Sequence, residues 1–318
     1  MKAVLLRIGA LLISLVLASV VVFAVLRLLP GDAAGASLGV GSTTDQLESL
    51  RSELGTDQPV PVQYAHWVGD LVRGDLGDSF TSRQPVADLI AAKLPITVPL
   101  SLSAFVLAVL ISVPLGVIAA VYRRGPVGVI VSAISQLGVA VPVFWVGVLL
   151  ALVFALKLGW LPSGGFPRQG WDDPAGAIRS LTLPVITVAI AMSAVMVRYV
   201  RSATLDVLDQ DYLRTARSLG FSRWQALRRH GLRNAAVPVV SILGIELATS
   251  LLGAVVIENV FALPGLGTLL LTSVTGRDLP VVQALVLALT AVVLLMNTLV
   301  DVVQRMIDPR LRRAGVSA

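Results

Sequence analysis

The chain of 318 residues is 56% apolar and only 14% charged, with a formal net charge of +6, and its mean hydropathy is +0.85. A soluble globular protein keeps a far more polar surface, so this composition excludes that class and predicts a protein that lies mainly in lipid. The absence of cysteine excludes disulfides and thiolate metal sites. The two histidines, His66 and His230, are too few to predict a metal cluster.

Six apolar stretches are long enough to cross a bilayer as helices, which takes about 20 residues at about 1.5 Å of rise each. They are residues 8–29, 96–121, 128–156, 181–200, 236–257 and 281–303. The first follows Lys2 and Arg7 in the manner of a signal peptide, but it is longer than the apolar core of about 7 to 15 residues in such peptides. We therefore expect it to remain as an anchor, and we predict an all-α membrane protein with six transmembrane helices.

Charge predicts which side of the membrane each loop occupies. Six spans place both termini on one side of the membrane. That side has 16 basic and 5 acidic residues, whereas the other side has 9 basic and 13 acidic residues, with the intramembrane Glu246 counted on neither side. Cytoplasmic loops carry the excess of lysine and arginine, so both termini are predicted to be cytoplasmic. Because the basic residues follow membrane sidedness, their number does not indicate nucleic-acid binding.

Between the first two spans, residues 31–94 are predicted to form a small helical extracytoplasmic cap. Thr43 and Gln46 fit a capping box that opens one helix, and a second helix is expected from about Pro61 to Gly74. A third, over residues 85–94, is amphipathic and is expected to lie at the membrane surface. The cap is either a packed ectodomain without a site or a docking surface.

The loop of residues 201–238, between the fourth and fifth spans, is the most informative part of the chain. Residues 211–219 favour a helix that Gly220 can end, and Ser222 with Gln225 fits a capping box for a second helix. The apolar residues Ala216, Leu219, Phe221, Trp224 and Leu227 are interleaved there with arginines. Such a surface fits a groove on a protein partner, and a basic helix resting on anionic lipid is the alternative.

At this loop the sequence resembles the permeases of binding-protein-dependent ABC importers, in their dipeptide, oligopeptide and nickel branch. Residues 211–220 (DYLRTARSLG) are similar to the "EAA" loop of that family, with Arg214 and Thr215 in place of Glu and Ala, a variant common in this branch. Branch signatures extend over nearly the whole chain, and they include 29–32 (LPGD), 73–79 (RGDLGDS), 142–145 (PVFW), 258–267 (ENVFALPGLG) and 277–280 (RDLP).

The resemblance implies that this loop is a coupling helix seated in an ATPase subunit. The candidate coupling residues are Arg214, Thr215, Ala216, Arg217, Leu219, Gly220, Phe221 and Trp224. It also implies a second homologous permease, two ATPase subunits that bind ATP and Mg²⁺, and an external solute-binding protein. That protein would dock on the cap, for which the candidate residues are Gly74, Asp75, Gly77 and Asp78.

We accordingly expect a multi-pass permease of the bacterial inner membrane that imports dipeptides, oligopeptides or similar solutes. The expected parts are a first helix (1–30), the cap (31–94), a permease core (95–310) and a tail (311–318). The chain has no G-x-x-x-x-G-K-[ST] phosphate loop, so it is not expected to hydrolyse ATP itself. We assign it no catalytic, cofactor-binding or metal-binding residue.

Glu246 lies within the fifth span, where an unpaired charge is costly, so it is a candidate to line the pore or contact the solute. The alternative from another class is a proton-coupled secondary transporter that uses Glu246, although no internal repeat supports it. A membrane scaffold without transport would leave the loop unexplained. Glu258 is expected to anchor the loop that follows it, and Pro142 and Pro184 to favour kinks.

Overall fold

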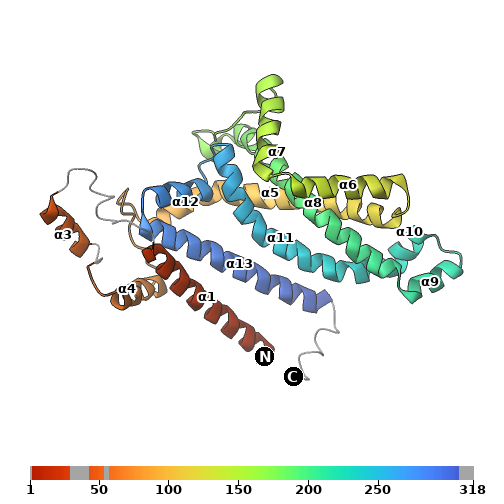
Figure 1. The fold of residues 1–318 in the computed structure, drawn as a ribbon, viewed down its shortest axis with the longest axis horizontal. Coiled ribbons are helices and arrows are strands. Elements are labelled where there is room, and N and C mark those ends of the chain that lie inside the picture. The colour runs from red at the N-terminus through yellow and green to blue at the C-terminus, as the bar shows by residue number, and fades with distance from the viewer. Residues whose placement is uncertain (1, 29–42, 54–56, 308–318) are drawn as a thin grey trace. The chain divides into compact units, whose positions relative to one another are not determined.

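The computed structural model describes residues 2–28, 43–53 and 57–307, which form helices joined by turns (Figure 1). Within these ranges the extended pairing is limited to one isolated antiparallel bridge between Asp78 and Pro85. In the described part of the chain five helices are long and apolar enough to cross a membrane, and a bent helix pair brings the number to six if the pair forms one span. Helices satisfy every backbone hydrogen bond within one segment, as the lipid interior requires. The predicted all-α membrane class is confirmed.

The long helices are α1 (Lys2–Leu28), α5 (Val86–Val121), α8 (Pro174–Leu208), α11 (Leu232–Val260) and α13 (Leu279–Ile307). The shorter α-helices are α3 (Thr44–Glu53), α4 (Val60–Val72), α6 (Pro126–Ala140), α7 (Val143–Leu150), α9 (Asp211–Ser218), α10 (Arg223–Ala226) and α12 (Leu266–Thr275). Two π-helical segments, η1 (Ala151–Lys157) and η3 (Leu227–Gly231), continue α7 and α10, and a 3₁₀ turn, η2 (Gly170–Asp172), precedes α8.

The third predicted span, residues 128–156, is not one straight helix. α6 and the helix formed by α7 with η1 meet at an angle of 99°, and Figure 1 shows α7 turning away from α6. Val141 is extended there, with φ −86° and ψ 126°, because the ring of Pro142 disfavours the helical conformation of the residue before it. Pro142 thus produces the predicted kink, whereas Pro184 lies inside an uninterrupted α8.

The prediction of a separate surface helix over residues 85–94 was wrong. These residues form the first turns of α5, which runs without interruption from Val86 to Val121 and passes through Pro95. Proline is tolerated inside membrane helices because neighbouring groups can satisfy the carbonyl that it leaves without an N–H partner. The apolar residues that surround Pro95 on both sides give this helix no reason to end.

The first predicted cap helix has the expected start. The backbone N–H of Thr43 donates to Gln46 Oε1 at 3.0 Å, and the Gln46 N–H donates to Thr43 Oγ1 at 3.4 Å. These reciprocal bonds form the predicted capping box before α3. The second predicted helix is α4, which ends just before Gly74, a residue in the left-handed conformation with φ 84°.

The described residues within 2–96, together with 264–294, form one compact unit. Its buried core contains Val86, Leu266, Val281, Ala284 and Leu285. An aromatic cluster also joins α1 to α4. In this cluster the ring of Phe23 lies 5.3 Å from Tyr64 and 5.8 Å from Trp67, and the Tyr64 hydroxyl lies 2.9 Å from Ser19 Oγ.

Residues 97–263 and 295–307 form the second unit, in which α8 packs against α6, α7 and α11. Small residues let these helices approach closely. A Cβ added to Gly116 would lie 2.6 Å from the Cβ of Val200, and one added to Gly138 would lie 2.7 Å from the Cβ of Ala194. The helix interfaces around α8 therefore require glycine at both positions.

Candidate functional site

The loop between α8 and α11 has the predicted order of helix, glycine and helix. α9 ends at Ser218, and Gly220 takes the left-handed conformation with φ 93°. The Ser222 N–H then donates to Gln225 Oε1 at 3.0 Å, and the Gln225 N–H donates to Ser222 Oγ at 3.2 Å. This capping box fixes the start of α10, so the local sequence determines the shape of the loop.

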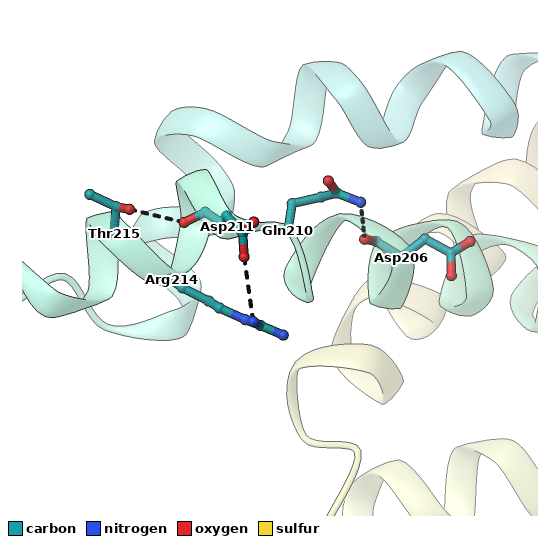
Figure 2. Close-up of polar contacts among 5 residues, drawn as sticks. All are labelled: Asp206, Gln210, Asp211, Arg214 and Thr215. Carbon is teal, nitrogen blue, oxygen red and sulfur yellow. Dashed lines mark hydrogen bonds and ion pairs between the residues drawn. The ribbon is translucent and has the colours of Figure 1, made fainter.

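Polar contacts around Asp211 order the start of α9 (Figure 2). Asp211 Oδ1 lies 3.4 Å from Arg214 Nη1, and the backbone carbonyl of Asp211 accepts a 3.0 Å hydrogen bond from Thr215 Oγ1. Just before α9, Gln210 Nε2 donates to the backbone carbonyl of Asp206 at 3.2 Å. Asp211 stands in the first helical turn, where a negative charge complements the helix dipole. Because the ion pair is exposed, it contributes little to stability.

One side of α9 is buried against other helices of the second unit. Leu213 is fully buried and Ala216 is 7% exposed. They belong to a core that α5, α8 and α11 also supply, together with Val117, Val121, Val200, Val207, Ala226, Leu227 and Ala235. Ala216, a candidate coupling residue, therefore faces its own chain.

The other side of the loop is exposed and apolar. Leu219 is 75% exposed and Trp224 is 48% exposed, and an added Cβ at Gly220 would meet no atom within 4 Å. Arg214, Thr215 and Arg217 are exposed beside them, and Phe221 is half-buried beneath the guanidinium of Arg229. An exposed tryptophan next to arginines is typical of a protein-binding surface. We call Leu219, Gly220 and Trp224, with Arg214 and Arg217, the loop surface.

An ion pair links this region to the turn between α5 and α6. Arg123 Nη1 lies 2.9 Å from Asp209 Oδ2. The hydrogen bond from Arg123 is the main cause that lowers the pKa of Asp209, and the charges of Arg123, Arg214 and Arg223 lower it further. Arg217 and Arg223 line a small pocket beside the pair. The pair thus joins the α5–α6 turn to the end of α8, next to Arg217 of the loop surface.

The four candidate docking residues lie together in the turn after α4 and are exposed. Gly74 and Gly77 both have positive φ, at 84° and 74°, a conformation that suits glycine. The Gly77 N–H donates to Asp75 Oδ1 at 2.8 Å. Asp78 pairs with Pro85 across the turn, so all four belong to one ordered loop.

This loop is held by Asp278, a residue for which the sequence analysis predicted no role. Asp278, 3% exposed, accepts hydrogen bonds from Ser79 Oγ at 2.5 Å, the Phe80 N–H at 3.0 Å and the Thr81 N–H at 3.4 Å. Hydrogen bonds to a charged acceptor are among the stronger ones in proteins. The only sequence signal was the branch signature at residues 277–280, which gives no partner for its acid.

The two acids of α11 have different environments. Glu246 is half-buried and lies 3.5 Å from Thr249 Oγ1. Glu258 is fully buried, accepts a 2.5 Å hydrogen bond from Thr97 Oγ1, and uses its backbone carbonyl to accept the Leu263 N–H at 2.8 Å. Glu258 therefore begins the turn that follows it, as predicted, and its side chain also binds α5.

Comparison with known families decides what this arrangement belongs to. The family described as the binding-protein-dependent transport system inner membrane component matches residues 112–313, and its N-terminal companion matches residues 1–101. The chain belongs to this family. It is therefore a permease of an ABC importer and a multi-pass protein of the inner membrane, as the sequence predicted. This membership favours the importer over the proton-coupled alternative.

Relatives of similar length support the same assignment. The permease is 40% identical over 306 residues to the glutathione transport system permease protein GsiC of Escherichia coli K12, covering 96% of this chain and 97% of the relative. It is 41% identical over 298 residues to a Brucella abortus protein that carries the name of a peptide transport system permease, covering 94% and 95%.

Solved structures show the shared fold. The permease resembles the MetNI methionine ABC transporter in an inward-facing conformation, with a TM-score of 0.58 at 19% identity over 69% of this chain and 96% of that one. It also resembles an amino acid ABC transporter solved with histidines, with a TM-score of 0.54 at 20% identity over 69% and 94%. The permease therefore has the fold of ABC importer membrane subunits.

Proposed function

We propose that this permease is one of two homologous membrane subunits of an importer for peptides or similarly sized solutes. Two observations support the solute class: the Brucella relative is named for peptide transport, and the Escherichia relative is named for glutathione, which is a tripeptide. The lack of a phosphate-binding loop supports the view that the energy comes from partner subunits, which bind ATP and Mg²⁺.

The loop surface is the proposed seat of the ATPase partner. Leu219 and Trp224 expose apolar area that a groove can bury, while Arg214 and Arg217 can pair with acids at its rim. Nucleotide then drives transport if it binds one arrangement of the complex more tightly than the other. The observation that carries this proposal is an exposed apolar surface on a loop whose opposite side is buried among α5, α8 and α11.

The proposed binding of the ATPase at the loop surface also determines which side of the membrane each part of the chain faces. The loop surface and both termini face the cytoplasm, which agrees with the excess of basic residues on that side. The turn that contains Gly74, Asp75, Gly77 and Asp78 then faces outward, where an external solute-binding protein docks. Its order, maintained by Asp278, provides that protein with a surface of fixed shape.

The test is co-purification of the tagged permease in mild detergent, followed by mass spectrometry and assay of ATP hydrolysis. Gly220→Trp and Arg217→Glu should abolish recovery of the ATPase. The matched controls are Gly159→Trp, at another exposed glycine with positive φ and open space, and Arg168→Glu, at another exposed arginine.

Recovery of an ATPase with wild type and both controls, but not with the two loop variants, supports the proposal. Equal recovery from all variants would show that the partner binds elsewhere. Recovery of the permease alone, with solute uptake into liposomes in the absence of ATP, would contradict the importer.

A further inference from the structure

Glu246 is the single charged residue in the middle of the spans. The other span centres, residues 8–26, 97–121, 126–156, 181–197 and 281–300, contain no Asp, Glu, Lys or Arg, and residues 234–257 contain Glu246 alone. Glu246 stands about 18 Å along α11 from Asn234 and about 21 Å from Val260, at about 1.5 Å per residue. It therefore lies near the centre of the bilayer.

The carboxylate of Glu246 has little to compensate its charge. Among the described residues its side-chain partner is Thr249, whose hydroxyl lies 3.5 Å from Oε2. A carboxylate at this depth is costly when it faces lipid, and such groups face a partner or a water-filled path. The position of Glu246 thus requires something polar on this side of α11.

The exposed side of α11 has the composition of a solute path. Ile245, Leu252 and Val256 are 54%, 52% and 46% exposed, Thr249 is exposed between them, and Gly253 has open space in front of it. The opposite side is packed, with Ala248, Ser250, Ala254 and Ile257 at most 2% exposed. We call Ile245, Glu246, Thr249, Leu252, Gly253 and Val256 the α11 face.

We infer that the α11 face lines the solute pathway and that Glu246 attracts the positively charged amino group of the solute. This inference rests on the proposed function and narrows the solute class to molecules with a free amino group, such as a peptide with an unblocked N-terminus. A mostly apolar lining with one or two polar groups is typical of small-molecule sites. A single negative charge in a region of low dielectric favours cations over anions.

The cysteine-free sequence allows a direct test in the complete importer reconstituted in liposomes. Thr249→Cys places the only thiol of this chain about 5 to 6 Å from residue 246, one helical turn away, and its labelling is read on this subunit by mass spectrometry. Its reaction rates with trimethylammonium-ethyl and sulfonato-ethyl methanethiosulfonate are then compared. We expect both reagents to react from water and the ratio of cationic to anionic rates to fall about tenfold when Glu246→Gln is added.

Controls separate charge from structure. Glu246→Asp keeps the charge and should keep the rate ratio, and a thiol at the exposed Ser163 should show a ratio that does not respond to Glu246→Gln. Gly253→Cys, one turn further along the α11 face, is a second reporter if Thr249→Cys does not assemble.

The outcomes distinguish this inference from the proposed function. If neither reporter on the α11 face reacts while the thiol at Ser163 does, the face is covered by lipid or by the second permease, and the inference is overturned. An unchanged rate ratio overturns it as well. ATP-driven uptake by the same liposomes tests the proposed function separately. If uptake is normal and the ratio of cationic to anionic reaction rates is unchanged by Glu246→Gln, only the inference is contradicted.

Discussion

Thr97 Oγ1 donates a hydrogen bond of 2.5 Å to Glu258 Oε1, and both side chains are fully buried. The two residues are 161 positions apart in the sequence and join α5 to the end of α11. A buried hydroxyl or carboxyl that loses its partner bears the whole cost of desolvation. This bond should therefore contribute to the packing of the second unit.

Glu258→Ala should lower the free energy of unfolding by about 1 to 3 kcal/mol, because it leaves the Thr97 hydroxyl without this acceptor in a buried site. Thermal unfolding in detergent, followed by tryptophan fluorescence, measures the change. Glu48→Ala, at an exposed position of α3, is the control. An unfolding temperature equal to that of wild type would show that the buried bond contributes nothing.

Asp278→Ala should loosen the turn that it holds. The Phe80 and Thr81 amides donate to this carboxylate, and hydrogen bonds to charged groups stabilise by about 1.5 to 3 kcal/mol, so their hydrogen exchange should quicken about ten- to hundredfold. Hydrogen–deuterium exchange with mass spectrometry over residues 78–84 detects this. The exposed Asp57→Ala serves as control, and unchanged protection in Asp278→Ala would refute the role of the carboxylate.

The ion pair of Arg123 and Asp209 predicts a pH dependence. The hydrogen bond from Arg123 lowers the pKa of Asp209, so its contribution to stability is present above the ordinary aspartate pKa and disappears as pH falls through the lowered value. The unfolding temperature of wild type should exceed that of Asp209→Asn by a small, constant margin between about pH 5 and 8. The difference should begin to shrink below about pH 4 and should vanish only below the lowered pKa. Unfolding temperatures across this range provide the comparison, and a margin that persists in acid would contradict it.

Gly138→Ala should destabilise the contact of α6 with α8, since its Cβ would lie 2.7 Å from that of Ala194. Overpacking of this kind costs about 1 to 3 kcal/mol. Gly69→Ala, in α4 with no atom within 4 Å of the added Cβ, is the matched control. There alanine should be neutral or stabilising, because it favours helix by about 0.5 to 1 kcal/mol over glycine. Equal unfolding temperatures for the two variants would contradict the close approach.

The sequence predicted best where local chemistry decides the structure. The capping box of Ser222 and Gln225 and the left-handed Gly220 follow from neighbouring residues, and both occur as predicted. The length of α11 also follows from its apolar run. These features depend on short-range interactions, which a single sequence contains in full.

Pairings over long distances were beyond the same reasoning. No local pattern indicates that Asp278 accepts hydrogen bonds from residues 79–81, or that Glu258 meets Thr97. Pro142 indicated a kink, but not an angle of 99°, which depends on how α7 packs against α8 and α11. The amphipathic pattern of residues 85–94 indicated a separate surface helix, but these residues continue into the membrane helix α5.

The burial of Leu213 and Ala216 has a mechanical consequence. Because its inner side is packed among α5, α8 and α11, α9 cannot move independently of these helices. A densely packed contact transmits displacement instead of absorbing it. A displacement of Trp224 by a bound partner would thus be transmitted to the transmembrane helices. The stiffness of this small core would determine how large the resulting displacement of those helices is.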